Sequence, residues 1–137
     1  MEAILQSLIS GIPILALHIV TTFAILIGGM GIYMWITPYA DIKLVREGNT
    51  AAAVALGGAF LGLAVPLAGS LAGSVTALDI LLWGLVTLVV QLISFKVVDL
   101  VLRGLPKRIS DGEMSAAIFL AFVNISVGAI VATAVTR

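Results

Sequence analysis

The sequence predicts an all-α membrane protein in which four transmembrane helices form two parallel two-helix repeats. Hydrophobic residues make up 61% of the 137 residues, whereas charged residues make up only 10%. A soluble domain averages about 45–50% apolar and about 25% charged residues, so this chain has too little charge to coat a soluble globule. We therefore expect residues 1–137 to form a single integral membrane domain.

The gaps between charged residues define four expected spans, at residues 11–36, 50–72, 79–101 and 114–135. Each is long enough for the ~20 residues that a helix needs to cross a bilayer. Lipid cannot satisfy free backbone groups, so a span must be a helix or part of a closed barrel. The apolar runs are continuous rather than alternating, which favours helices. The first run is too long, and lacks the basic start, for a cleaved signal peptide.

The distribution of basic residues predicts the orientation. The first and third loops carry five of them: Lys43, Arg46, Arg103, Lys107 and Arg108. The second loop and the N-terminal segment carry none, and the C-terminal end carries only Arg137. Loops rich in lysine and arginine stay in the cytoplasm. We therefore expect a multi-pass protein of the bacterial inner membrane with both termini in the periplasm.

Polar residues mark the expected helix ends. Asn49 is a suitable N-cap for the second span. Thr76 with Asp79, and Ser110 with Glu113, have the spacing of capping boxes that open the third and fourth spans.

An internal duplication is indicated by a shift of 64 residues. The shift aligns Lys43 with Lys107, Gly48 with Gly112, Ala52 with Ala116, Ala53 with Ala117 and Leu56 with Leu120. Residues 11–72 and 79–135 then form two repeats, each with two spans joined by a basic loop. Because each repeat has an even number of spans, both insert the same way up, with a pseudo-axis along the membrane normal.

The first loop and the start of the second span carry the most specific motif. It contains T-P-Y at residues 37–39, an aspartate, and L-V-R-E-G-N-T-A-A-A at residues 44–53. Its candidate site residues are Thr37, Pro38, Tyr39, Asp41, Arg46, Gly48 and Asn49. The proline should end the first helix, and the tyrosine ring suits the membrane interface. The segment is either a docking or ligand site on the cytoplasmic face or simply a well-formed loop.

This motif resembles the bacterial inner-membrane family named domain of unknown function 350, also called YjfL-like. The resemblance extends over nearly the whole chain, although the fourth span carries the motif in eroded form, with Glu113 in place of Asn49 and Ile130 in place of Pro66. The resemblance implies a multi-pass inner-membrane protein without an established activity, and it points to envelope stress as one context.

The second span is rich in small residues. Those that share one face are Gly58, Gly62, Pro66, Gly69 and Gly73. Small faces let helices approach closely in lipid. A second small face contains Ala53, Gly57, Ala64 and Ala68, which exceeds what one internal neighbour needs, so we expect a homo-oligomer. Replacing Gly62 with leucine should then disrupt assembly. Pro66 either kinks this helix or breaks it to build a transport site.

Three polar residues stand out within the spans, namely His18, Gln91 and Asn124. At ~1.5 Å per residue, Gln91 and Asn124 lie near the bilayer midplane, and both should point into the bundle or a subunit interface. None of the three is a carboxylate, and a single histidine cannot build a metal triad. The sequence contains no cysteine, P-loop or H-E-x-x-H motif. We therefore expect no catalytic residues, no metal and no cofactor.

These observations favour a non-enzymatic, oligomeric component of the membrane that presents its cytoplasmic loops to a cytoplasmic or membrane protein. The alternative is a channel or transporter for a small ion or solute, supported by Pro66 and the mid-membrane amides. An enzyme subunit that modifies lipid or binds a cofactor is a third hypothesis, opposed by the lack of ionisable residues at depth. The net charge of zero argues against nucleic-acid binding; membrane lipids are the expected surroundings.

Overall fold

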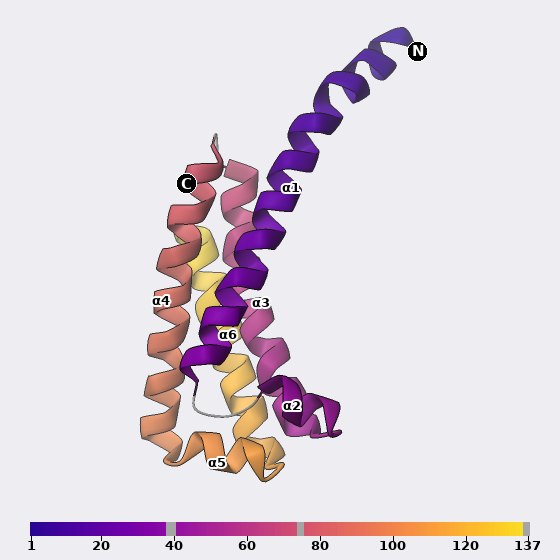
Figure 1. The fold of residues 1–137 in the computed structure, drawn as a ribbon. Coiled ribbons are helices and arrows are strands. Elements are labelled where there is room, and N and C mark those ends of the chain that lie inside the picture. Colours follow the sequence, from indigo (N-terminus) through magenta and orange to yellow (C-terminus); the bar gives the residue numbers. More distant parts are fainter. Residues whose placement is uncertain (38–40, 74–75, 136–137) are drawn as a thin grey trace.

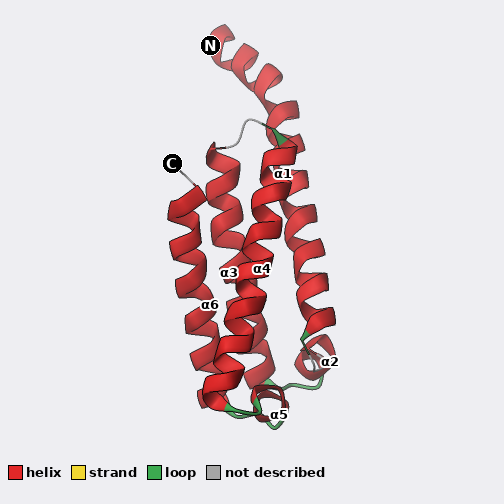
Figure 2. Ribbon diagram, turned by 90° about the vertical axis from the view of Figure 1, so that its left-hand side faces the viewer, coloured by secondary structure: helices red, strands yellow, loops and turns green. Residues whose placement is uncertain are grey.

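The computed structural model describes residues 1–37, 41–73 and 76–135, and these residues form helices and short turns without a strand (Figure 2). The helices are α1 (Glu2–Ile36), α2 (Asp41–Arg46), α3 (Thr50–Gly73), α4 (Ala77–Leu102), α5 (Leu105–Ser110) and α6 (Met114–Val135). Four of them, α1, α3, α4 and α6, are long and apolar enough to cross a membrane. The predicted all-α class with four membrane-spanning helices is therefore confirmed.

The four long helices run side by side, and the two short helices lie together at one end of the bundle (Figures 1 and 2). Helix α3 packs against every other helix, and its most extensive contact is with α6. Helix α4 covers α3 and α6, and α1 crosses α3 and α4. The arrangement makes α3 the central helix.

The contact between α3 and α6 is a close backbone approach that glycine makes possible. A methyl group added at Gly58 would collide with the backbone of Ala121, and one added at Gly128 would collide with the backbone of Gly62. In lipid, association depends on such packing rather than on hydrophobicity. The small face expected on the second span therefore serves packing within the chain.

The boundaries of the long helices agree with the predicted spans except at the first. The helix expected to span residues 11–36 begins at Glu2 and continues through Pro13, and no charged residue interrupts it after Glu2. At its other end, Thr37 is extended (φ −70°, ψ 131°), as expected for a residue that precedes a proline. Pro38 and Tyr39 lie outside the described residues, so the interfacial position expected for the tyrosine ring stays a prediction.

The loops between the spans are shorter than expected. The segments interpreted as charged loops each contain a six-residue helix, α2 and α5. The capping box expected at Ser110 is wrong, since Ser110 is the last residue of α5 and the chain turns at Gly112 before α6 begins. The box expected at Thr76 is supported, because its hydroxyl accepts a hydrogen bond from the Asp79 N–H at 3.2 Å.

Candidate functional site

The most elaborate polar structure of the molecule lies at the end where α2 and α5 meet. We call α2, α5 and the turns at residues 47–49 and 111–113 the basal platform (Figure 1). The two turns have the same backbone geometry, with Gly48 at φ 86° and Gly112 at φ 84°. Only glycine adopts this left-handed conformation without strain, so these glycines allow each short helix to turn directly into a long one.

Both turns close with the same hydrogen bonds. The glycine N–H donates to the carbonyl three residues back, at 3.0 Å for Gly48 and 2.9 Å for Gly112. The N–H of the next residue, Asn49 or Glu113, donates to the carbonyl five residues back, at 2.9 Å in each turn. This pair of bonds is a Schellman motif, which satisfies the free carbonyls at a helix end.

Asn49 joins the two halves of the basal platform, which are α2 with the turn at residues 47–49 and α5 with the turn at residues 111–113. Its Oδ1 accepts a hydrogen bond from the Ala52 N–H at 3.0 Å, so the predicted N-cap of the second span is confirmed. Its Nδ2 donates to the carbonyl oxygens of Ile109 at 3.2 Å and Ser110 at 3.0 Å. One amide therefore caps α3 and holds the end of α5, across 60 residues of sequence.

Glu113 occupies the position equivalent to Asn49 but binds within its own half. Arg108 Nε donates to Glu113 Oε2 at 2.8 Å, and Arg108 Nη1 donates to the Leu102 carbonyl at 2.9 Å. The hydrogen bond from Arg108 lowers the pKa of the Glu113 carboxyl, and the same bond raises the pKa of Arg108. The pair ties the start of α6 to α5 and to the end of α4.

Asp99 fixes the other end of α5. Its Oδ1 accepts a hydrogen bond from the Leu105 N–H at 2.9 Å. The sequence interpretation missed the roles of Asp99 and Arg108. In a chain with so few charges, the clustering of both around the third loop was the available signal.

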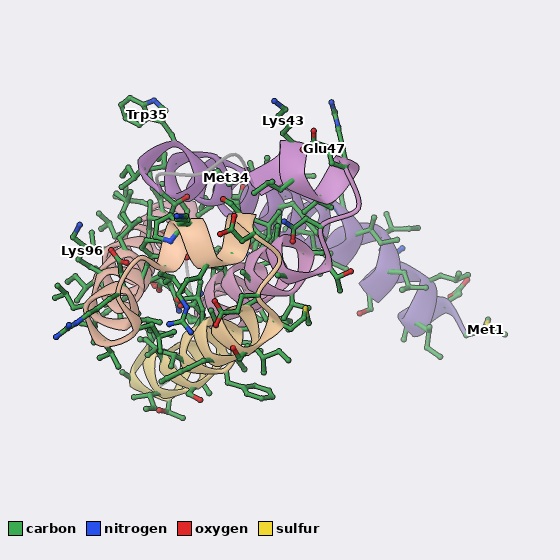
Figure 3. The ribbon with its side chains drawn as sticks, turned by 90° about the horizontal axis from the view of Figure 1, so that it is seen from below. Met1, Met34, Trp35, Lys43, Glu47 and Lys96 are labelled. Carbon is green, nitrogen blue, oxygen red and sulfur yellow. The ribbon has the colours of Figure 1, made fainter. Side chains whose placement is uncertain are left out.

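The outer surface of the platform is charged. Arg46, Glu47 and Lys107 are exposed, and Figure 3 shows Lys43 pointing outward from α2. A shallow polar hollow of about 530 Å³ lies between the two turns, with Glu47 and Asp111 on its rim. Of the other candidate loop residues, Thr37 is buried, and Asp41 is the first residue of α2.

The small residues singled out on the second span lie along α3. Gly58, Gly62 and Pro66 are buried, Gly69 is half-buried, and Gly73 is the last residue of the helix. Helix α3 continues without interruption through Pro66, so its backbone does not form the broken helix of a transport site. The second small face is open around Gly57: apart from its chain neighbours and its own helix backbone, no described residue lies within 4 Å of a methyl group added there.

The side chain of Gln91 meets the backbone of Asn124 inside the bundle. Gln91 and Asn124 are both fully buried, as their expected depth on neighbouring helices requires. Gln91 Nε2 donates to the backbone carbonyls of Gly62 at 3.0 Å and Asn124 at 3.1 Å. Gln91 Oε1 and both polar side-chain atoms of Asn124 have no hydrogen-bond partner in the described part of the chain. His18 is half-buried on α1.

The family that this chain matches is described as one of unknown function. The family model described as "Domain of Unknown Function (DUF350)" matches residues 7–135. Two relatives, both named "UPF0719 inner membrane protein YjfL", come from Escherichia coli strain K12 and Escherichia coli O157:H7. Each is 35% identical over 89 residues, which cover 65% of this chain and 67% of the relative. No solved structure matches the chain.

Proposed function

The chain belongs to the DUF350 family, and from that premise we propose that it is a non-enzymatic inner-membrane protein that presents the basal platform to a cytoplasmic protein. The inner-membrane location is supported by the two relatives, which are named as inner membrane proteins. The observation that carries the proposal is the bridge from Asn49 to the carbonyls of Ile109 and Ser110. This bridge turns two loops that are distant in sequence into one fixed surface.

The distribution of charge supports a surface made for recognition. The chain has seven basic and seven acidic residues, and nine of these fourteen lie at residues 41–47 and 103–113. A surface with charges of both signs held at fixed positions gives specificity and faster association with a complementary protein. Five of the nine are basic, which supports a cytoplasmic location for the platform.

The two-repeat organisation and the oligomer remain parts of the same proposal. The matching turns at Gly48 and Gly112 support a duplication into repeats at residues 11–72 and 79–135. The open face of α3 around Gly57 supports contact with a further subunit. Two repeats inserted in the same direction place both turns at the same membrane surface, which is what a continuous platform requires.

Orientation is tested first, in intact cells. Single cysteines at Gly48 and Gly104 should be shielded from an impermeant thiol reagent, whereas a cysteine at Gly73 should be labelled. The chain has no native cysteine to interfere. The reverse pattern would place the platform outside the cytoplasm and end the proposal.

Partner recognition is tested by photocrosslinking in cells. A photoreactive amino acid at Lys43 or Lys107 should give one discrete protein adduct, while the same residue at lipid-facing Ile130, which is 69% exposed, should not. Adding Asn49→Ala should weaken the adduct because the bridge between the two halves is lost. Platform positions that crosslink no more than Ile130 does would contradict the proposal.

A channel or transporter for a small ion or solute is the second candidate, supported by the unpartnered polar atoms of Gln91 and Asn124. Such atoms are costly at the centre of a membrane, and a polar solute could satisfy them. Proteoliposomes containing the full chain should then show a flux that Gln91→Leu abolishes. Flux no greater than in empty liposomes would leave the platform as the functional element.

A further inference from the structure

Helix α1 is too long to lie wholly within the hydrocarbon of a bilayer. Its 35 residues measure about 52 Å at ~1.5 Å per residue. Placing all of it inside a ~30 Å hydrocarbon core would require a tilt of roughly 55°, whereas spanning helices tilt by at most about 40°. Part of α1 therefore lies outside the hydrocarbon.

The part of α1 that lies outside the hydrocarbon is its N-terminal third. The C-terminal part of α1 packs on the bundle, where Met30 and Tyr33 are each 1% exposed. Every residue from 1 to 17 is exposed. Figure 1 shows this end of α1 continuing past the bundle at the end opposite α2 and α5, and Figure 3 shows Met1 well outside the outline of the other helices.

The sequence of this segment is divided between two faces. The apolar residues, spaced three and four apart, are Ile4, Leu5, Leu8, Ile9 and Ile12, and the polar residues on the other side are Glu2, Gln6, Ser7 and Ser10. Residues with this spacing share one face of a helix. The C-terminal part of α1 has no comparable polar face, since residues 23–36 are uncharged and almost wholly apolar.

Pro13 marks the point at which the two parts of α1 can differ in direction. A proline inside a helix removes one backbone hydrogen bond and crowds the carbonyl four residues back, here that of Ile9. Helices bend at such positions.

We propose that residues 2–12 form an interfacial segment that lies along the membrane surface opposite the basal platform, with its apolar face in the lipid. That face continues the lipid-facing surface of the bundle, which includes the exposed Val20 and Ile27 of the same helix. The segment contains Glu2 and no basic residue. Its contact with lipid therefore depends on apolar burial, and zwitterionic lipid suffices without anionic headgroups.

The segment is tested by labelling single cysteines in the full chain, reconstituted in nanodiscs of zwitterionic lipid. A water-soluble thiol reagent reaches both surfaces of a nanodisc, so the result does not depend on orientation. Cysteines on the polar face, at Gln6 and Ser10, should react at least tenfold faster than those on the apolar face, at Leu5 and Ile9.

Two controls set the scale. A cysteine at Ile27, 66% exposed at mid-span, should be unreactive, and one at Glu47 on the platform should react fully. Equal fast reaction on both faces would place the segment in water, and equal slow reaction would place it in the hydrocarbon; either result overturns the proposal. The apolar face could also lose its protection in nanodiscs that hold a single copy of the chain. In that case a second copy, not lipid, covers the face, and the proposal is overturned.

Discussion

Helices α3 and α6 begin 64 residues apart with the same turn, yet α3 lies at the centre of the bundle and α6 at its edge. In the most apolar stretch of each helix, 56% of the residues of α3 are buried, compared with 22% in α6. The two helices remain alike only in their first turns, where Ala52 and Ala116 are both buried and so are Leu56 and Leu120. Farther along the two helices, residues that are 64 positions apart face different surroundings.

At two positions of α3, a glycine faces another helix, whereas the residue 64 positions later on α6 is larger and exposed. Gly58 packs on Ala121, whereas Phe122, 64 residues after Gly58, is 65% exposed. Gly62 is buried, whereas the equivalent Ser126 is exposed. The turn depends on local backbone geometry and is the same before α3 and before α6, while the residues beyond it differ with the neighbours that each helix has.

The largest effect should come from placing a leucine at these equivalent positions. A methyl group at Gly62 would already lie 2.7 Å from both the Asn124 carbonyl oxygen and Gln91 Nε2. We expect Gly62→Leu to destabilise the bundle by roughly 3 kcal/mol, and Ser126→Leu by less than about 0.5 kcal/mol. Thermal unfolding in detergent measures both. Equal effects would show that α3 is no more central than α6.

The cap position should give the next largest difference. Asn49→Ala removes the cap of α3 and both bonds to α5, and we expect a loss of about 2 kcal/mol. Glu113→Ala removes an exposed ion pair, and such pairs contribute little, so its effect should be clearly smaller. Denaturation of the two variants in the same detergent makes the comparison. A larger loss for Glu113→Ala would mean that the ion pair, not the amide bridge, holds the platform.

The two turn glycines should respond alike. Gly48→Ala and Gly112→Ala each force a side chain into the left-handed conformation, at a cost of about 1–2 kcal/mol. Apart from its chain neighbours, no described residue lies within 4 Å of the added methyl group at either position, so backbone strain is the main expected effect. Unfolding midpoints that differ between the variants by more than the error would break the equivalence of the two turns.

The smallest effect should be a loss of stability at acidic pH that depends on the Arg108–Glu113 pair. Because the hydrogen bond from Arg108 holds the pKa of Glu113 below its ordinary 4.5, the pair stabilises the fold above that value. The stabilisation is lost as the pH falls through the lowered pKa of the folded state. Unfolding midpoints measured from pH 6 to pH 3 should fall less in Glu113→Gln than in the parent. Identical profiles would contradict this assignment.

Much of the fold could be predicted because long helices in lipid follow from uncharged length alone. The end of α1 before Thr37 and the start of α3 at Thr50 could also be predicted, because Pro38 and Asn49 act on their immediate neighbours in the chain. Burial of Gln91 and Asn124 followed from their depth, because a lipid-facing amide is unfavourable. Each of these inferences depends on a residue and its local environment.

The remaining features depend on contacts between distant segments. The bonds from Asn49 to α5 connect positions 60 and 61 residues apart, and no local pattern indicates them. Helices α2 and α5 are six residues each, too short to show a periodic pattern. The sequence also could not show which of the two small faces of α3 meets α6, because both satisfy the same spacing rule.

The central position of α3 has a consequence for how the protein is made. Its main neighbour, α6, begins at residue 114, whereas α3 ends at residue 73. At about 5–20 residues per second, a ribosome needs about 2–8 s to synthesise the intervening chain. During this interval the glycine face of α3 lacks the helix it fits, because α6 has not yet been synthesised. Substitutions at Gly128 on α6 therefore act late in biogenesis, after the first three long helices have been synthesised.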